Sequence, residues 1–124
     1  MRETRGAGFA GRWRSFGFAI RGLGVILNTQ PNARIHAFCT VAVCLFGALL
    51  RISAWEWCAI SFAIAGVWIT ECLNTALEFL ADHASPGYSA LIRDAKDVAA
   101  AGVLIASCAA VVIGIIVFAA RILS

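Results

Sequence analysis

The sequence has little charge and lacks the signatures of the common soluble nucleotide-binding enzymes. Only 14% of its 124 residues are charged and 61% are hydrophobic, whereas a soluble domain has about 25% charged and 45–50% apolar residues. So few polar residues could not cover a water-soluble monomer, and we predict a single-domain integral membrane protein. A Walker A loop, a protein-kinase signature and a GxGxxG fingerprint are absent. Any use of ATP would therefore not rely on those folds.

Paired cysteines and a secretion signal are also missing. None of the five cysteines forms a CxxC pair, and no His/Cys group has the spacing of a zinc site. We expect the cysteines to be small buried hydrophobic residues, and we expect no disulfide framework. No apolar h-region with a small-residue cleavage site precedes the first long apolar run, so we also expect no cleaved signal peptide.

Three apolar segments are long enough to cross a bilayer, which takes about 20 residues. They run from about Ile35 to Ser53, from Trp55 to about Leu80 and from Val98 to Ala120, and the third carries no charge. We therefore predict an all-α membrane protein with three transmembrane helices.

The segment ahead of these spans is basic and amphipathic. We divide it into a basic tail, residues 1–13, and an interfacial helix, about residues 14–29, in which Phe16, Ile20, Leu23 and Leu27 share one face. A fourth, short membrane element stays open as an alternative. Six arginines crowd this part of the chain: Arg2, Arg5, Arg12, Arg14, Arg21 and Arg34. The positive-inside rule therefore places the N-terminus in the cytoplasm.

A polar face interrupts the second span near its end, in the stretch "ITECLNTALEFLAD" from Ile69 to Asp82. Five polar residues fall within an arc of roughly 100° on a helix: Glu71, Asn74, Thr75, Glu78 and Asp82. Glu71 would lie about 10 Å deeper in the membrane than Glu78, at 1.5 Å per residue. A carboxylate within a span is costly and points to a functional site, whereas the two outer carboxylates could simply be solvated at the helix end.

Such a face can bind a divalent cation, act as a general base or carry protons. Magnesium usually takes one or two carboxylates and completes its shell with water and nucleotide phosphates. The segment "RDAKDVAAAG" places Lys96 and Asp97 at the start of the third span, where a lysine could meet phosphate. A solvated, charged helix boundary is the simpler explanation of that segment taken alone.

The two segments together resemble the small bacterial membrane kinases of diacylglycerol and undecaprenol. The family pattern E-x-x-N-[ST]-A-x-E-x-x-x-D, followed by A-K-D, is matched at every fixed position by Glu71, Asn74, Thr75, Ala76, Glu78, Asp82, Ala95, Lys96 and Asp97. The resemblance extends from about Phe16 to Phe118, nearly the whole chain.

This resemblance implies a homotrimer in the bacterial inner membrane, with one amphipathic surface helix and three transmembrane helices per chain. It implies transfer of the γ-phosphate of ATP to diacylglycerol or undecaprenol at the cytoplasmic interface, with Mg²⁺, giving phosphatidic acid or undecaprenyl phosphate. By position, Glu71 would be the general base and Glu78 the metal ligand. Four residues would position the nucleotide: Asn74, Asp82, Lys96 and Asp97. No nucleic-acid partner is expected.

The chain departs from the family pattern at one position. A glutamate that takes part in metal and nucleotide binding in the family aligns with Gln30, which has no negative charge. Gln30 and Asn32 are still expected at the cofactor site. Arg34 and His36 also match the family, and an interfacial anchor is an equally good explanation of both.

Two alternatives to a lipid kinase remain open from the sequence. The loss of a carboxylate at Gln30 suggests a non-catalytic member of the family. A membrane-embedded Glu71 also suits a small proton-coupled transporter, although carriers typically place their site near the membrane midplane rather than toward one face.

Overall fold

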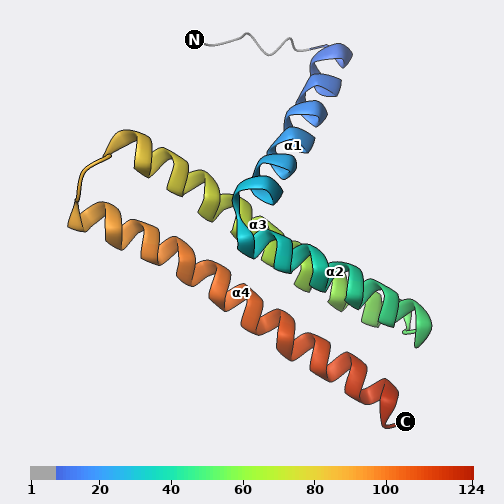
Figure 1. Ribbon diagram of the computed structural model, residues 1–124. Coiled ribbons are helices and arrows are strands. Elements are labelled where there is room, and N and C mark those ends of the chain that lie inside the picture. The colour runs from blue at the N-terminus through green and yellow to red at the C-terminus, as the bar shows by residue number, and fades with distance from the viewer. Residues whose placement is uncertain (1–7) are drawn as a thin grey trace.

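The computed structural model describes residues 8–124, which form four helices and no strand. These are α1 (Phe9–Thr29), α2 (Pro31–Leu49), α3 (Ala54–Ala84) and α4 (Ala90–Ile122). Helices α2, α3 and α4 are each long and apolar enough to cross a membrane. The predicted all-α fold with three candidate spans is confirmed. Figure 1 shows α3 and α4 running antiparallel over their whole length, with α2 packed along the first part of α3.

Helix α1 leaves the bundle at a steep angle, joined to α2 by the single residue Gln30 (Figure 1). It begins at Phe9, so part of the expected basic tail is helical, and residues 1–7 lie outside the described residues. Pro31 occupies the first position of α2, where its missing N–H costs nothing and its fixed φ suits a helix. The helix that contains the predicted first span therefore starts at Pro31, four residues before Ile35.

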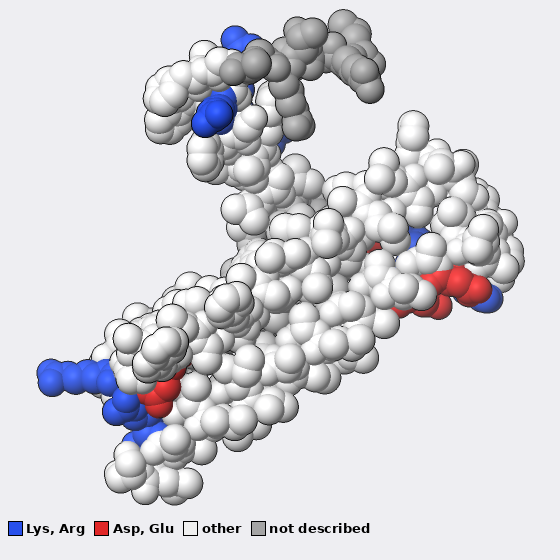
Figure 2. All heavy atoms as spheres, turned by 180° about the vertical axis from the view of Figure 1, so that it is seen from behind, with Lys and Arg blue, Asp and Glu red and all other residues white. Residues whose placement is uncertain are grey.

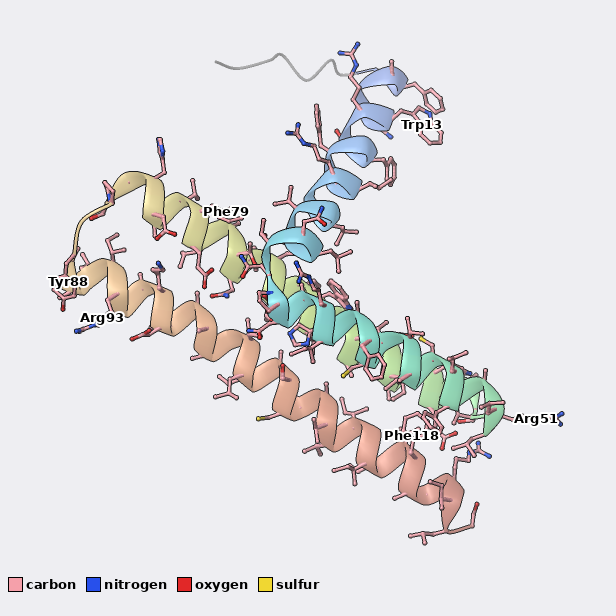
Figure 3. The ribbon with its side chains drawn as sticks, in the orientation of Figure 1. Trp13, Arg51, Phe79, Tyr88, Arg93 and Phe118 are labelled. Carbon is pink, nitrogen blue, oxygen red and sulfur yellow. The ribbon has the colours of Figure 1, made fainter. Side chains whose placement is uncertain are left out.

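The same helix ends at Leu49, before the end of the predicted span at Ser53, because a compact turn follows it. Arg51 adopts a left-handed φ of 51°, and Ser53 begins α3 through a capping box with Glu56. Glu56 Oε2 also accepts a 2.7 Å hydrogen bond from Arg121 Nη2 at the end of α4. This turn and ion pair hold the ends of three helices together, and Figure 3 shows Arg51 extending away from them.

The apolar core within one chain is small and lies near this turn. Ile52, Ile60 and Val117 are buried there, and Trp57 and Phe118 pack against them. Most large apolar side chains of the four helices are instead exposed, as expected where lipid rather than water is the solvent. The cysteines are free, and Cys72 alone is half-buried while Cys39, Cys44, Cys58 and Cys108 are exposed. The expected burial of the cysteines within the chain is therefore wrong, because apolar residues of a membrane helix need not face its interior.

Gly47 is required for the close contact between α2 and α3. A methyl group added at Gly47 would lie 2.8 Å from Cη2 of Trp57 and 3.1 Å from Cδ1 of Ile52. We expect Gly47→Ala to lower the free energy of unfolding by about 1–3 kcal/mol through overpacking. Unfolding in detergent micelles, followed by circular dichroism, measures this change.

Gly66→Ala is the matched control, because Gly66 also lies within a helix and a methyl group there meets nothing within 4 Å. It should leave stability unchanged or raise it by up to about 1 kcal/mol, as alanine is the better helix former. Equal effects of the two substitutions would contradict the packing that we assign to Gly47.

The packing register shows how far each helix extends along the bundle. His36 of α2 lies against Glu71, and Lys96 of α4 lies against Asp82. At 1.5 Å per residue, α2 begins about 7 Å beyond the level of Glu71, whereas α3 continues about 20 Å beyond it. The last turns of α3 and the first turns of α4 therefore project past α2. Figure 2 shows charged side chains at the two ends of the bundle and on α1, with an uncharged surface between them.

Candidate active site

The polar face predicted from the sequence is buried where α3 packs against the first turns of α2. The side chains of Glu71 and Thr75 are each 1% exposed and that of Asn74 is 9% exposed, and no other polar residue in the described part of the chain is buried. Helix α2 places His36 opposite this face, with its Nε2 atom 3.4 Å from Oε2 of Glu71. The acidic face is thus turned toward the interior of the chain at its deep end.

Four buried polar atoms at this point have no hydrogen-bond partner in the described structure: His36 Nε2, Glu71 Oε2, Asn74 Oδ1 and Thr75 Oγ1. A buried polar atom without a partner costs roughly 1–3 kcal/mol, and native proteins contain few of them. His36 Nε2 and Glu71 Oε2 face each other, whereas Asn74 Oδ1 and Thr75 Oγ1 indicate places where a ligand, an ion or water supplies the missing partner.

A groove of about 320 Å³, which we call the deep groove, opens beside His36, Glu71 and Asn74. Thr75 lines a different groove, between α1 and α3. Asn32, Glu71 and Asn74 provide polar walls from α2 and α3. Helix α4 closes the other side with mostly apolar residues, including Val103 and Leu104. The deep groove therefore combines a polar floor with an apolar wall, which suits the polar end of an amphiphilic molecule.

A second groove of about 420 Å³, the outer groove, lies at the connection between α3 and α4. Lys96 Nζ donates a 2.7 Å hydrogen bond to Asp82 Oδ1 there, and Asp97 lines the same groove. Figure 3 shows Tyr88 and Arg93 at this tip of the molecule.

Glu78 lies between the two grooves. Its Oε1 atom accepts a 3.4 Å hydrogen bond from Nδ2 of Asn74, one turn closer to the deep groove. The polar face of α3 is therefore continuous from Glu71 to Asp82, and most of the residues expected at the site lie along it.

Two residues at the junction of α1 and α2 lie apart from both grooves. Arg34 donates hydrogen bonds from Nε to the carbonyl of Leu27 at 2.9 Å and from Nη2 to that of Asn28 at 2.8 Å. These carbonyls belong to the last turn of α1, so Arg34 satisfies groups that a helix end leaves without partners. Gln30 is half-buried, and its side chain lines neither groove of this chain.

From the sequence, the role of His36 stayed open and its support by two neighbours was missed. Trp68 Nε1 donates to Thr40 Oγ1 at 3.0 Å, and Thr40 Oγ1 donates to the carbonyl of His36 at 2.7 Å. The rings of His36 and Trp68 meet edge to face, with centroids 6.4 Å apart. The i, i+3 spacing of Trp68 and Glu71 and the i, i+4 spacing of His36 and Thr40 are the signals that could have found this group.

The oxygen atoms of the polar face suit magnesium better than they suit a transition metal. No group of three His, Cys, Asp or Glu side chains comes together within residues 8–124. Magnesium, however, needs only one or two carboxylates and favours oxygen ligands. Glu78 supplies such a carboxylate, and the adjacent Asn74 Oδ1 is a buried carbonyl oxygen without a partner.

Comparison with known proteins agrees with these features. A sequence model of the family described as "Prokaryotic diacylglycerol kinase" matches residues 17–118, which include both grooves. The chain is 34% identical over 106 residues to the undecaprenol kinase of Bacillus subtilis (strain 168), covering 86% of each protein. It is 41% identical over 101 residues to the diacylglycerol kinase of Synechocystis sp., covering 81% of this chain and 58% of that protein.

The family match spans most of the chain and includes the buried Glu71, both grooves and nearly all of the three candidate membrane helices. The chain therefore belongs to the prokaryotic diacylglycerol kinase family of membrane lipid kinases.

Proposed function

We propose that this protein transfers the γ-phosphoryl group of ATP to the hydroxyl group of diacylglycerol or undecaprenol at the cytoplasmic face of the bacterial inner membrane. The observation that carries the proposal is the buried carboxylate of Glu71 in the wall of a groove whose other side is apolar. A lipid hydroxyl placed there would supply a donor to Glu71 while its chain stays in apolar surroundings.

Glu71 would act as the general base of this reaction. The lipid oxygen forms a bond to the γ-phosphorus, the bond from that phosphorus to the β-phosphate oxygen breaks, and the hydroxyl proton passes to the Glu71 carboxylate. Glu71 is 1% exposed, so bulk water has little access to this carboxylate.

The nucleotide would occupy the outer part of the polar face. Lys96 would bind the phosphates as a point charge. Asp82 would orient Lys96 through their hydrogen bond, and Asp97 would orient the ribose end of the nucleotide in the outer groove. Asn32 would contact the nucleotide from α2. Glu78 and Asn74 would hold magnesium, which neutralises charge on the phosphates when bound.

We also propose a homotrimer with its N-terminus in the cytoplasm. The apolar groove between α2, α3 and α4 is open in one chain, with a volume of about 190 Å³, and most large apolar side chains are exposed. Basic residues at the α1 end outnumber those at the other end, where Arg121 is paired with Glu56 and Arg51 lies in the turn. This distribution supports the orientation through the positive-inside rule.

Gln30 would be the weak point of the magnesium and nucleotide site. We expect Gln30→Glu to lower the magnesium concentration needed for half-maximal activity by about tenfold, because it restores the negative charge that the family pattern has at this position. The measurement is the rate of lipid phosphorylation as magnesium is varied at saturating ATP. An unchanged magnesium dependence would mean that Gln30 only links α1 and α2, as its position in a single chain suggests.

A side-by-side assay of the two lipids tests the proposed function. Purified protein in mixed micelles would be given Mg-ATP with diacylglycerol or undecaprenol, and labelled phosphate in the lipid fraction would be measured. We expect transfer to one lipid to exceed transfer to the other, and that lipid is the substrate. No transfer to either lipid would contradict the proposal.

The two alternatives from the sequence give different results in the same preparation. A non-catalytic family member would form intact oligomers without binding Mg-ATP, and a proton-coupled transporter would move solute into vesicles without ATP. The family assignment favours the kinase over the transporter.

A further inference from the structure

We propose that His36 is a positioning residue for Glu71, holding its carboxylate in the orientation that receives the proton of the lipid hydroxyl. The inference rests on the proposed function of Glu71 as the general base. It is carried by the geometry of the contact between α2 and α3, where two buried polar groups from different helices face each other.

The first step is the contact between the two side chains. His36 Nε2 and Glu71 Oε2 are 3.4 Å apart, both atoms are buried, and neither has a hydrogen-bond partner. An imidazole N–H and a carboxylate oxygen are complementary, and their usual hydrogen-bond distance is about 2.7–2.9 Å. Catalytic hydrogen bonds are often long in the absence of substrate and shorten when it binds. The two atoms therefore need to move by only about half an ångström to pair.

The second step is that the imidazole ring is itself held in place. Its ring packs edge to face against Trp68, and Trp68 is fixed by its hydrogen bond to Thr40. Thr40 lies one turn after His36 on α2 and donates to its carbonyl. Trp68 and Glu71 lie on the same face of α3, so this face supports the ring on one side and receives its hydrogen bond on the other.

The third step is the division of the carboxylate between two partners. Oε2 faces His36 and is enclosed, whereas Glu71 as a residue also lines the deep groove. A hydrogen bond from His36 to Oε2 leaves Oε1 for the lipid hydroxyl. It also prevents rotation of the carboxylate, so that Oε1 keeps a fixed orientation toward the lipid hydroxyl as the lipid binds.

An anchor at the membrane surface does not account for this arrangement. The His36 side chain is only 16% exposed and lies more than one helical turn inside the start of α2. Anchoring side chains extend toward the headgroups, whereas His36 turns inward to the one buried carboxylate of α3.

Two substitutions at this position separate a hydrogen bond from simple packing. His36→Phe keeps a ring against Trp68 and removes the donor, and we expect it to lower kcat by about 10- to 100-fold. His36→Gln keeps an N–H near the position of Nε2 and should stay within about threefold of the unsubstituted protein. The KM for ATP should change by less than about twofold in both variants, because His36 lines the deep groove and not the outer groove where the nucleotide would bind.

The double variant tests whether His36 acts through Glu71. In a protein that already carries Glu71→Gln, His36→Phe should cause no further loss of kcat, because the carboxylate that it orients is gone. A purely structural role predicts instead that the two losses multiply and that Phe and Gln are equally harmful. Either of those results, or an unchanged kcat in His36→Phe, overturns the inference.

A spectroscopic measurement tests the contact without relying on activity. The chain has two histidines, His36 and the exposed His83, so a spectrum of ¹⁵N-histidine-labelled protein in micelles contains one signal set for each. We expect Glu71→Gln to shift the Nε2 signal of His36 and to leave that of His83 unchanged. If the protein phosphorylates neither lipid but this shift is seen, the proposed function fails and the contact stands. Absence of the shift overturns the inference whatever the activity.

Discussion

Glu71→Gln should lower the rate of lipid phosphorylation by about 10²- to 10⁴-fold, the usual contribution of a positioned general base. Glutamine has nearly the shape of glutamate, so it fits the same enclosed space between α2 and α3, where Glu71 is 1% exposed. It cannot take up the hydroxyl proton. Binding of Mg-ATP in the outer groove should persist, because the substitution leaves Lys96 and Asp82 in place.

Initial rates in mixed micelles, together with an equilibrium measurement of Mg-ATP binding, test this expectation. Glu56→Gln is the matched control, since it makes the same chemical change on the same helix at the opposite end of the bundle. Glu56 pairs with Arg121 and caps α3, so this control should cost stability and keep the catalytic rate. A Glu71→Gln protein with the full rate would refute Glu71 as the base.

Lys96→Met should reduce kcat/KM for ATP by about 10²- to 10³-fold, the usual loss when a donor to a reacting phosphate or oxyanion is removed. Methionine matches the length and apolar stem of lysine but has no charge. Loss of the ammonium group also leaves Asp82, which lies 2.7 Å from it in the unsubstituted protein, as an unpaired negative charge where the anionic nucleotide would bind. Lys96→Arg should recover only part of the loss, because a planar guanidinium does not replace a compact ammonium group.

Steady-state kinetics with ATP varied at fixed lipid measures this loss, and the KM for lipid should hardly change. Arg51→Met provides the control, as it removes one exposed positive charge at the end of the bundle that lies away from both grooves. An equal loss in the two variants would point to general electrostatic attraction of ATP rather than to a contact with Lys96.

Much of the fold follows from the spacing of residues along single helices. The three apolar runs predict the three candidate spans because the length of a membrane helix is set by the bilayer. The positions of Glu71, Asn74 and Thr75 predict one polar face, and all three side chains are buried together. Such features depend on local periodicity, which a sequence displays directly.

Contacts between helices were less accessible from the sequence. The hydrogen bonds from Arg34 to the last turn of α1 depend on the angle at Gln30, and no local pattern specifies that angle. The contact of His36 with Glu71 depends on the register between α2 and α3, which is fixed by packing around Gly47 and Trp57. Helix ends differed by several residues because capping at Ser53 and Pro31 decides them, whereas hydropathy changes gradually there.

The unequal lengths of α2, α3 and α4 make the protein one-sided. At the end of the bundle marked by Arg51, the three helices finish at a short turn and an ion pair, and all the surplus length of α3 and α4 lies at the other end with both grooves. In the orientation that we propose, with the N-terminus in the cytoplasm, an inhibitor that resembles a nucleotide and cannot cross the bilayer would therefore not reach the proposed active site from outside the cell. A lipid-like inhibitor that enters from within the membrane plane would not meet that barrier.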